Sequence, residues 1–229
     1  MRPLHPTDLV TAEAAITVDL VLPNDQMYEP ACGLASAVYL EVLTFETLAR
    51  PPRLIVLHLN GEIIASCGIE LASEVADNVL KVETFAAGHE AELRASCREH
   101  GATQPHQWAE ISAFNVVSEH RRPEVVQALL SEAFAYLRDL NVPASTHILS
   151  AALRPPLRAL GAKIKNICKA SAENYSGTAA QRQTITDKYL TPCRAKCVHI
   201  ATNTVGRAAA TLITGPSLAV HHSETRLRA

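Results

Sequence analysis

Aromatic residues are scarce in this 229-residue chain, at 4% of the sequence, and charged residues make up only 19%. With so few large rings, leucine, valine, isoleucine and alanine must supply most of the packing. Apolar residues nevertheless reach 48%, which is enough for a substantial core. The length fits one domain of ordinary to large size, or one domain with an irregular tail.

A surplus of basic residues is also missing, since the formal net charge is −2. This balance excludes a general nucleic-acid binder, which normally carries excess positive charge on one face. No apolar run approaches the ~18 to 20 residues that span a bilayer, so we expect no transmembrane segment. The N-terminus lacks a basic start followed by an apolar block, so it is a poor secretory signal and we expect a cytoplasmic protein.

Paired cysteine motifs are absent as well. The six cysteines are scattered and lie mostly in apolar patterns, which is typical of reduced core residues. Cys193, Cys197 and His199 have a spacing that matches no common zinc site, and no second pair complements them. We therefore predict no disulfide framework, no metal site and no permanently bound cofactor.

Hydrophobic periodicity and turn residues predict the secondary structure along the chain. The predicted elements, in order, are a strand over 16–22, a helix over 31–49, a hairpin over 54–69 with its turn at Asn60-Gly61, a mixed helical stretch over 82–100 ending at Gly101, a strand over 108–117, a helix over 123–139, a strand over 146–149, a helix over 154–160, a strand over 163–167, a surface loop over 170–187, and two final strands over 196–201 and 208–213. As domains, we expect a flexible leader over 1–14, one domain over 15–204, and a terminal strand with a weakly ordered tail over 205–229.

The segment between the strand over 108–117 and the helix over 123–139 carries the clearest chemical signal. An apolar strand ends in a short charged turn, and a helix begins at once with Pro123, which suits the first helical position. This geometry directs the free N–H groups of the first helical turn toward an anion above the strand end. Arg121 and Arg122 add positive charge at the same place, so the segment is predicted to hold phosphate. A solvated basic helix cap is the alternative reading of the two arginines.

Residues 116–130 resemble, without a gap, the acyl-CoA-binding element of the GNAT superfamily of N-acetyltransferases. The usual form there is Val-x-Pro-Glu-x-Arg-Gly-x-Gly-x-Gly-x-Ala-Leu-Leu. A later stretch, Leu157 to Ile164, is similar to the element that follows the fifth strand in that superfamily. The resemblance implies an α/β (α+β) fold with a mixed, mostly antiparallel central sheet flanked by helices, over roughly residues 16–200.

This chain departs from the superfamily at the phosphate-binding turn. Glu124 and Val126 stand where the family has glycines that let a pyrophosphate approach the backbone. The aromatic general acid often found before the final Leu-Gly is also missing. Two branches tolerate such changes. The thermostable hemolysin family is the more similar one, on its central Asn-Gly hairpin, on residues 83–85 and on the strand that starts at Glu110.

Acyl-homoserine-lactone synthases carry a similar Glu-x-Ser-Arg-Phe strand. Here Glu110, Ser112 and Phe114 match that strand, but Ala113 replaces the arginine. The resemblance implies that Glu110 and Ser112 are catalytic. If the strand faces the acyl site, a partly buried Glu110 would have a raised pKa and could accept a proton from an attacking amine. An exposed carboxylate at the strand end is the alternative.

The resemblance further implies where an acyl donor binds. The fourth and fifth strands of the implied fold splay apart, which frees the backbone N–H groups of Asn115, Val116 and Val117 to bind the thioester carbonyl and the pantetheine arm. A fully paired strand is the alternative. At the turn and the helix start, the implied donor-binding residues are Arg121, Arg122, Glu124, Val126 and Gln127.

The predicted function is N-acyl transfer from an acyl thioester to a small amine, by direct attack. The donor would be acyl-CoA or acyl-phosphopantetheine. A carrier-protein donor is favoured because its single phosphate demands less than coenzyme A does. Two further classes stay open: a GNAT-like binding or regulatory module without catalysis, and a membrane-active, hemolysin-like protein.

Overall fold

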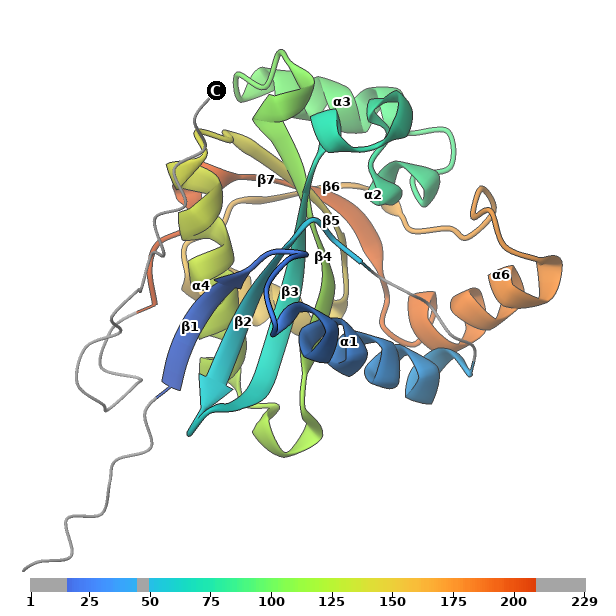
Figure 1. Ribbon diagram of the computed structural model, residues 1–229. Helices are drawn as coiled ribbons and strands as arrows, with labels where there is room; N and C mark the ends of the chain where they lie inside the picture. Colours follow the sequence, from blue (N-terminus) through green and yellow to red (C-terminus); the bar gives the residue numbers. More distant parts are fainter. Residues whose placement is uncertain (1–15, 45–49, 209–229) are drawn as a thin grey trace, which may run out of the picture.

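The protein folds around one seven-stranded sheet, shown in a computed structural model that describes residues 16–44 and 50–208 (Figure 1). The strand order is β1-β2-β3-β4-β5-β7-β6. The strands are β1 Ile16–Val21, β2 Arg53–Leu59, β3 Glu62–Leu71, β4 Trp108–Val116, β5 Ala144–Leu149, β6 Ile164–Lys169 and β7 Lys196–Ala201. All neighbours pair antiparallel except β4 and β5, which are parallel. The predicted mixed, mostly antiparallel sheet is therefore confirmed.

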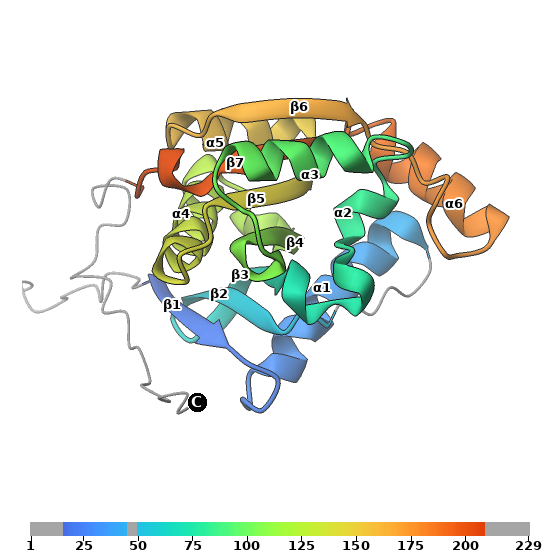
Figure 2. The ribbon, with the colours of Figure 1, turned by 90° about the horizontal axis from the view of Figure 1, so that it is seen from above.

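Helices cover both faces of this sheet (Figures 1 and 2). One face is covered by α4 Pro123–Asp139 and α5 Arg154–Ala159, whose apolar side chains pack with those of the central strands into the largest core cluster. The other face is covered by α1 Tyr28–Leu43, α2 Lys81–Thr84, α3 Glu90–Glu99, α6 Ala179–Ile185 and the π-helical turn Thr186–Leu190. The site described below is lined by residues of the sheet and of helices from both faces.

Most predicted elements occur within a few residues of their expected bounds. The hairpin at Asn60-Gly61 forms, with positive φ at both turn residues, as a type I′ turn requires. The helix expected over 31–49 begins three residues earlier, at Tyr28. Residues 1–15, 45–49 and 209–229 lie outside the described chain, so the last predicted strand and the proposed domain bounds stay predictions.

The surface loop expected over 170–187 is wrong from residue 179 onward, whereas residues 170–178 do form a loop. This stretch contains α6 and leads directly into the π-helical turn. Thr178 caps α6, because its hydroxyl accepts the N–H of Gln181 at 3.2 Å while the Gln181 side-chain oxygen accepts the Thr178 N–H at 2.8 Å. The segment has few apolar residues, but Ile185 and Leu190 are buried and fix it against the sheet face.

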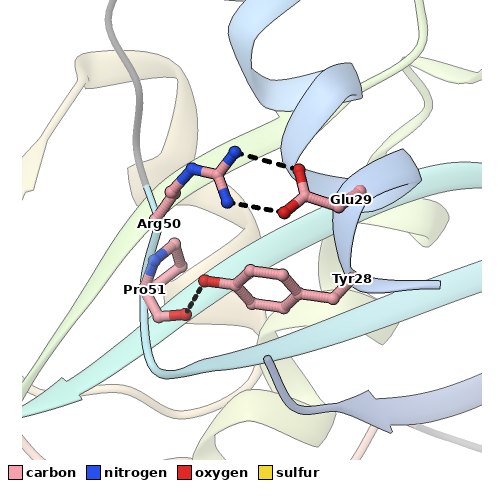
Figure 3. Close-up of polar contacts among 4 residues, drawn as sticks. All are labelled: Tyr28, Glu29, Arg50 and Pro51. Atoms are coloured by element: carbon pink, nitrogen blue, oxygen red, sulfur yellow. Dashed lines mark hydrogen bonds and ion pairs between the residues drawn. The ribbon is translucent and has the colours of Figure 1, made fainter. Parts of the chain in front are cut away.

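The start of α1 is fastened to the start of β2 by polar contacts (Figure 3). The Tyr28 hydroxyl donates to the carbonyl of Pro51 at 2.9 Å, and Arg50 forms a two-pronged ion pair with Glu29. Pro51 in turn packs on Gly68 of β3, where a Cβ added to the glycine would stand 2.5 Å from the Pro51 Cγ. Any side chain at Gly68 would displace Pro51 and loosen α1 from the sheet.

Strand β4 contains a β-bulge at its centre. Ser66 pairs with Asn115 and Gly68 with Ser112, so two β4 residues, Ala113 and Phe114, stand opposite one residue of β3. Ala113 has a φ of 47°, in the left-handed region that side chains with a Cβ rarely occupy. A bulge of this kind bends its strand and increases the local twist. Strand β4 pairs with β5 only before this bulge, as far as Glu110.

Candidate active site

The central feature of the site is a cleft between β4 and β5. Their backbones pair over only three positions, which end at Glu110 opposite Thr146. Beyond that point one side-chain contact spans the gap, because the Nδ1 of His147 lies 3.4 Å from the carbonyl oxygen of Ile111. The opening of the two central strands, which the family resemblance implied, is therefore present.

A cavity of about 890 Å³ fills the cleft and reaches both faces of the sheet. On the α4 side its walls are almost entirely apolar, with His147 as the one buried polar side chain. These residues are Val126, Leu130, Phe134, His147, Leu149, Leu153 and Leu157. On the other side the walls are aromatic and mixed. These residues are Val38, Tyr39, Leu43, Lys81, Phe85, Glu110, Ile148, Tyr175, Ile185 and Tyr189. A cavity of this size accommodates a drug-sized ligand.

Only part of the expected row of backbone donors faces the cleft. The Val117 N–H donates to the carbonyl of Ile64 at 2.9 Å and is therefore occupied by β3. Because hydrogen-bonding direction alternates along a strand, the Asn115 N–H also points to β3, and the Val116 N–H points into the cleft. The Val116 carbonyl faces the same way and accepts a hydrogen bond from Arg121 Nε at 3.1 Å. One backbone donor of the three, that of Val116, remains available for a ligand.

Glu110 lies at the inner end of the cleft and is only 2% exposed, so it is not the solvated strand-end carboxylate of the alternative reading. Its carboxylate accepts the N–H of Val82 at 2.8 Å. Burial raises the pKa of Glu110 to about 8, against the lowering effects of the Val82 N–H and the Lys81 charge. A carboxyl group with this pKa can exchange a proton near neutral pH.

Ser112 is the second residue predicted to be catalytic. It lies two positions beyond Glu110, so both side chains are on the same face of β4, and both line the cavity. Ser112 is opposite Gly68, and its hydroxyl oxygen would be 3.2 Å from a Cβ at that glycine. The structure thus brings Ser112 to the cavity wall.

The phosphate end of the predicted site lies at the turn into α4. Arg121, Arg122, Val126 and Gln127 all line the cavity. Arg122 is the N-cap residue, and its own N–H donates to the carbonyl of His120 at 2.7 Å. Pro123 has no N–H, so only the amides of residues 124 and 125 can receive an anion from the first helical turn.

Glu124 is exposed at this helix start and does not line the cavity. Its carboxylate adds negative charge where an anion would bind, while the Val126 side chain takes up space inside the cavity. Both observations agree with the crowding that the missing glycines imply. The cavity residues that were not predicted from the sequence include Tyr39, Lys81, His147 and Tyr189. They come from separate elements, and no local motif marks them.

His147 is a buried, neutral side chain of the cleft. Its Nε2 lies 2.9 Å from the Ser145 hydroxyl, and burial lowers its pKa to about 4. Its ring packs 5.8 Å from that of Phe134. His147 therefore lies between β4 and β5 and carries no charge at neutral pH.

The residues considered for a metal do not form a centre. Within the described ranges, no three histidine, cysteine or acidic side chains lie close enough together to hold an ion. Cys193 lines the cavity, whereas Cys197 and His199 are buried on β7. Among the helices that the structure describes, none has the length and apolar character to cross a membrane.

Comparison with known proteins gives matches at the level of structure. No family model and no curated protein matches the sequence. The AHL synthase LasI matches with a TM-score of 0.56 and 10% identity, over 86% of this chain and 98% of LasI. The CoA-dependent acyl-homoserine lactone synthase BjaI, with SAM and isopentyl-CoA, gives 0.53 and 13% identity, over 90% of this chain and 92% of BjaI.

A third structure, FeeM, is an N-acyl amino acid synthase from uncultured soil microbes. It matches with a TM-score of 0.51 and 12% identity, over 82% of this chain and 90% of FeeM. At such identities the likeness shows the fold, which is the GNAT-like fold shared by these acyltransferases. The finer resemblance to the thermostable hemolysin family stays a prediction.

Proposed function

We propose that this protein is an N-acyltransferase that moves an acyl group from an acyl thioester to a primary amine. The observation that carries the proposal is the early end of β4–β5 pairing, which leaves a cavity of about 890 Å³ with a buried carboxylate at its inner end. The fold is shared with synthases whose names describe acyl transfer to amines, and this supports the assignment. Fold alone would be insufficient, since one fold hosts many reactions.

The residues divide the chemistry between them. The acceptor reaches Glu110 as an ammonium group, and the Glu110 carboxylate removes one proton, directly or through a water molecule. The free amine attacks the thioester carbonyl carbon, and the N–H of Val116 stabilises the oxygen as it gains negative charge. The C–S bond then breaks and the nitrogen loses its second proton to the departing sulfur or to solvent, which gives a neutral amide and a thiol. The proton held by Glu110 passes to solvent, which restores the carboxylate for the next cycle.

The acyl tail is assigned to the α4 side of the cavity. That side combines leucine and phenylalanine side chains with a neutral histidine, so it offers no unpaired charge to a hydrocarbon chain. Burial of each methylene there contributes about 0.8 kcal/mol. The acceptor then enters from the opposite face of the sheet, where Glu110 lies.

The donor is either acyl-CoA or an acyl-phosphopantetheine on a carrier protein. Arg121 and Arg122 are placed to receive its phosphate. The backbone offers two free amides instead of a glycine-rich cradle, and Glu124 repels additional negative charge. This arrangement favours a single phosphate over the diphosphate of coenzyme A, and so favours an acyl-carrier protein as partner.

A binding or regulatory module without catalysis is the second candidate, because the same crowded helix start weakens donor binding. The decisive experiment incubates the purified chain with acyl-CoA or acyl-carrier protein of several chain lengths, together with a panel of primary amines. Thiol release and the amide product are followed by mass spectrometry. We expect amide formation that is lost in Glu110→Gln. Thermal stabilisation by acyl donors without any product would favour the binding module, and no response to any thioester would reject both.

A further inference from the structure

Two tyrosines stand beside Glu110 and have no part in the chemistry proposed above. Tyr39 comes from α1, and Tyr189 comes from the π-helical turn that follows α6. Both line the cavity on the face that Glu110 occupies. Tyr39, Tyr189 and Glu110 therefore line one cavity, and the charge of Glu110 contributes to raising the pKa of both tyrosines.

The two phenol hydroxyls have no protein partner in the described ranges. No hydrogen bond from Tyr39 or Tyr189 occurs there, whereas Tyr28 is paired with the Pro51 carbonyl. Both tyrosines are partly exposed and line the cavity, so their hydroxyls are free to bind a ligand there. Burial raises the pKa of Tyr39 to about 12, and burial raises the pKa of Tyr189 as well. Both phenols therefore stay neutral hydrogen-bond donors across the working pH range.

The nearby charge indicates what these donors receive. Lys81 also lines this part of the cavity, and its positive charge acts on Glu110. A ring of aromatic side chains around a carboxylate could hold a cationic ligand by cation–π contacts. Lys81 opposes an additional cation there and favours an anionic group next to the amine. An amine and an anionic group on neighbouring atoms describe an amino acid.

We propose that Tyr39 and Tyr189 are specificity-determining residues that bind the carboxylate of an α-amino acid acceptor and thereby place its amine at Glu110. This inference rests on the proposed acyl transfer and narrows its acceptor. The π-helical turn Thr186–Leu190 contributes to this site, because it carries Tyr189 and contacts α1, the helix that carries Tyr39. Single π-turns of this kind occur frequently at functional sites.

The energetic consequence is a strong preference against amines that lack the carboxylate. Such an acceptor would form neither of the two hydrogen bonds from the phenols to the carboxylate, which are charge-assisted and therefore stronger than neutral ones. The loss of both hydrogen bonds corresponds to a discrimination on the order of 10²-fold or more in kcat/KM. Replacing either tyrosine with phenylalanine removes a hydroxyl while the ring and its packing remain.

The experiment compares matched acceptor pairs with one acyl donor. Leucine is compared with 3-methylbutylamine, and phenylalanine with 2-phenylethylamine, for wild type, Tyr39→Phe, Tyr189→Phe and the double variant. We expect wild type to prefer each amino acid by about 10²-fold in kcat/KM, and each single variant to lose about tenfold of that ratio. The rate with the plain amine should change little. Tyr136→Phe, which removes a hydroxyl outside the cavity, is the control and should keep the wild-type ratio.

Two results would overturn the inference. One is equal use of amino acids and amines by wild type, and the other is an unchanged ratio in the double variant. Thermal unfolding of each variant confirms that it is folded. If no acceptor is acylated at all, the proposed function fails. The inference is then judged by calorimetric titration of leucine against 3-methylbutylamine: an amino-acid preference that the double variant loses supports the binding role, and its absence rejects it.

Discussion

The N–H of Val82 donates a hydrogen bond to the Glu110 carboxylate at 2.8 Å, which joins the short helix α2 to the central strand β4. The Val82 carbonyl in turn accepts a hydrogen bond from the Cys197 thiol, with Sγ 3.8 Å from the oxygen. The candidate base is thus positioned by a backbone amide, which cannot titrate. Its pKa depends on burial and on the charges around it, and this makes it testable by pH.

Replacing Glu110 with glutamine should lower kcat by roughly 10²–10⁴-fold, because the variant cannot remove a proton from the amine. In wild type the active form is the carboxylate, whose pKa is about 8, so kcat/KM should rise with pH and level off above about 8. Steady-state rates between pH 5.5 and 9.5 test this. Glu70→Gln, at the position paired with Glu110 on β3, is the control. Loss of its negative charge should shift the profile to slightly lower pH without abolishing activity, and a flat wild-type profile would contradict the assignment.

The same carboxyl group should make the folded state less stable at high pH. Its pKa rises from an ordinary value of 4.5 to about 8 on folding, so between these values the folded chain binds more protons than the unfolded chain. Stability contributed by the bound proton is complete below about 4.5 and is lost as pH rises through about 8. Glu110→Gln removes this dependence. Its Tm relative to wild type should therefore increase from pH 5 to pH 9, by about 2–4 °C per kcal/mol in a chain of this size.

Arg121 should matter more for donor binding than other surface arginines. Its Nε holds the Val116 carbonyl, and its guanidinium lines the cavity where the phosphate is expected. Arg121→Ala should raise the Kd for acyl-CoA by about tenfold or more, in line with the strength of hydrogen bonds to charged groups. Calorimetric titration at two salt concentrations measures this effect. Arg158→Ala on α5, which does not line the cavity, should bind the donor as wild type does.

The negative charge at the start of α4 should count against donors with several phosphates. Glu124→Gln should tighten the binding of CoA by roughly threefold, since about 0.3–1 kcal/mol is typical for one charge at a helix end. The binding of 4′-phosphopantetheine should improve less. Helix stability should fall slightly, because an acidic residue in the first turn is lost. Glu132→Gln, further along the same helix, is the matched control, and equal gains for both ligands would argue against repulsion at this site.

The bulge residue Ala113 should be replaceable by glycine with a gain in stability. A non-glycine residue in the left-handed region costs about 1–2 kcal/mol, and relief of this strain is partly offset because glycine is more flexible in the unfolded chain. Ala113→Gly is expected to raise Tm by a few degrees, whereas Ala113→Val should lower it. Thermal unfolding of both variants provides the measurement. A stable, active Ala113→Val would show that the left-handed conformation is dispensable.

Local signals in the sequence were sufficient to predict most strands and helices of the protein. Asn60-Gly61 marked the first hairpin, and Pro123 marked the start of α4, because each residue has a strong conformational preference of its own. The strand that carries Glu110 was recognised by its apolar pattern and by its likeness to a family motif. The burial of Glu110 could not be read locally, since Val82 and the helices that enclose it lie elsewhere in the chain.

The remaining parts of the site depend on tertiary packing. Tyr39, Lys81 and Tyr189 meet around Glu110 only after three separate elements have packed on one face of the sheet. The segment over 170–187 has a polar composition, and a polar segment without apolar periodicity is normally assigned to a loop. Ala170, Ala172 and Ile185 of this segment are buried, as is Leu190 just after it, and Ile185 also lines the cavity. The sequence also could not predict which N–H of residues 115–117 faces the cleft, because this depends on the register of β4 against β3.

The brevity of the β4–β5 ladder has a consequence for the protein as a whole. Strands β1–β4 and β5–β7 form two half-sheets that meet along three residue pairs. An extended thioester arm lying in the gap, hydrogen-bonded to Val116, would act as a temporary strand and close the seam between the halves. By mass action such binding would stabilise the native state, so the Tm of the protein would rise with the concentration of the proposed donor.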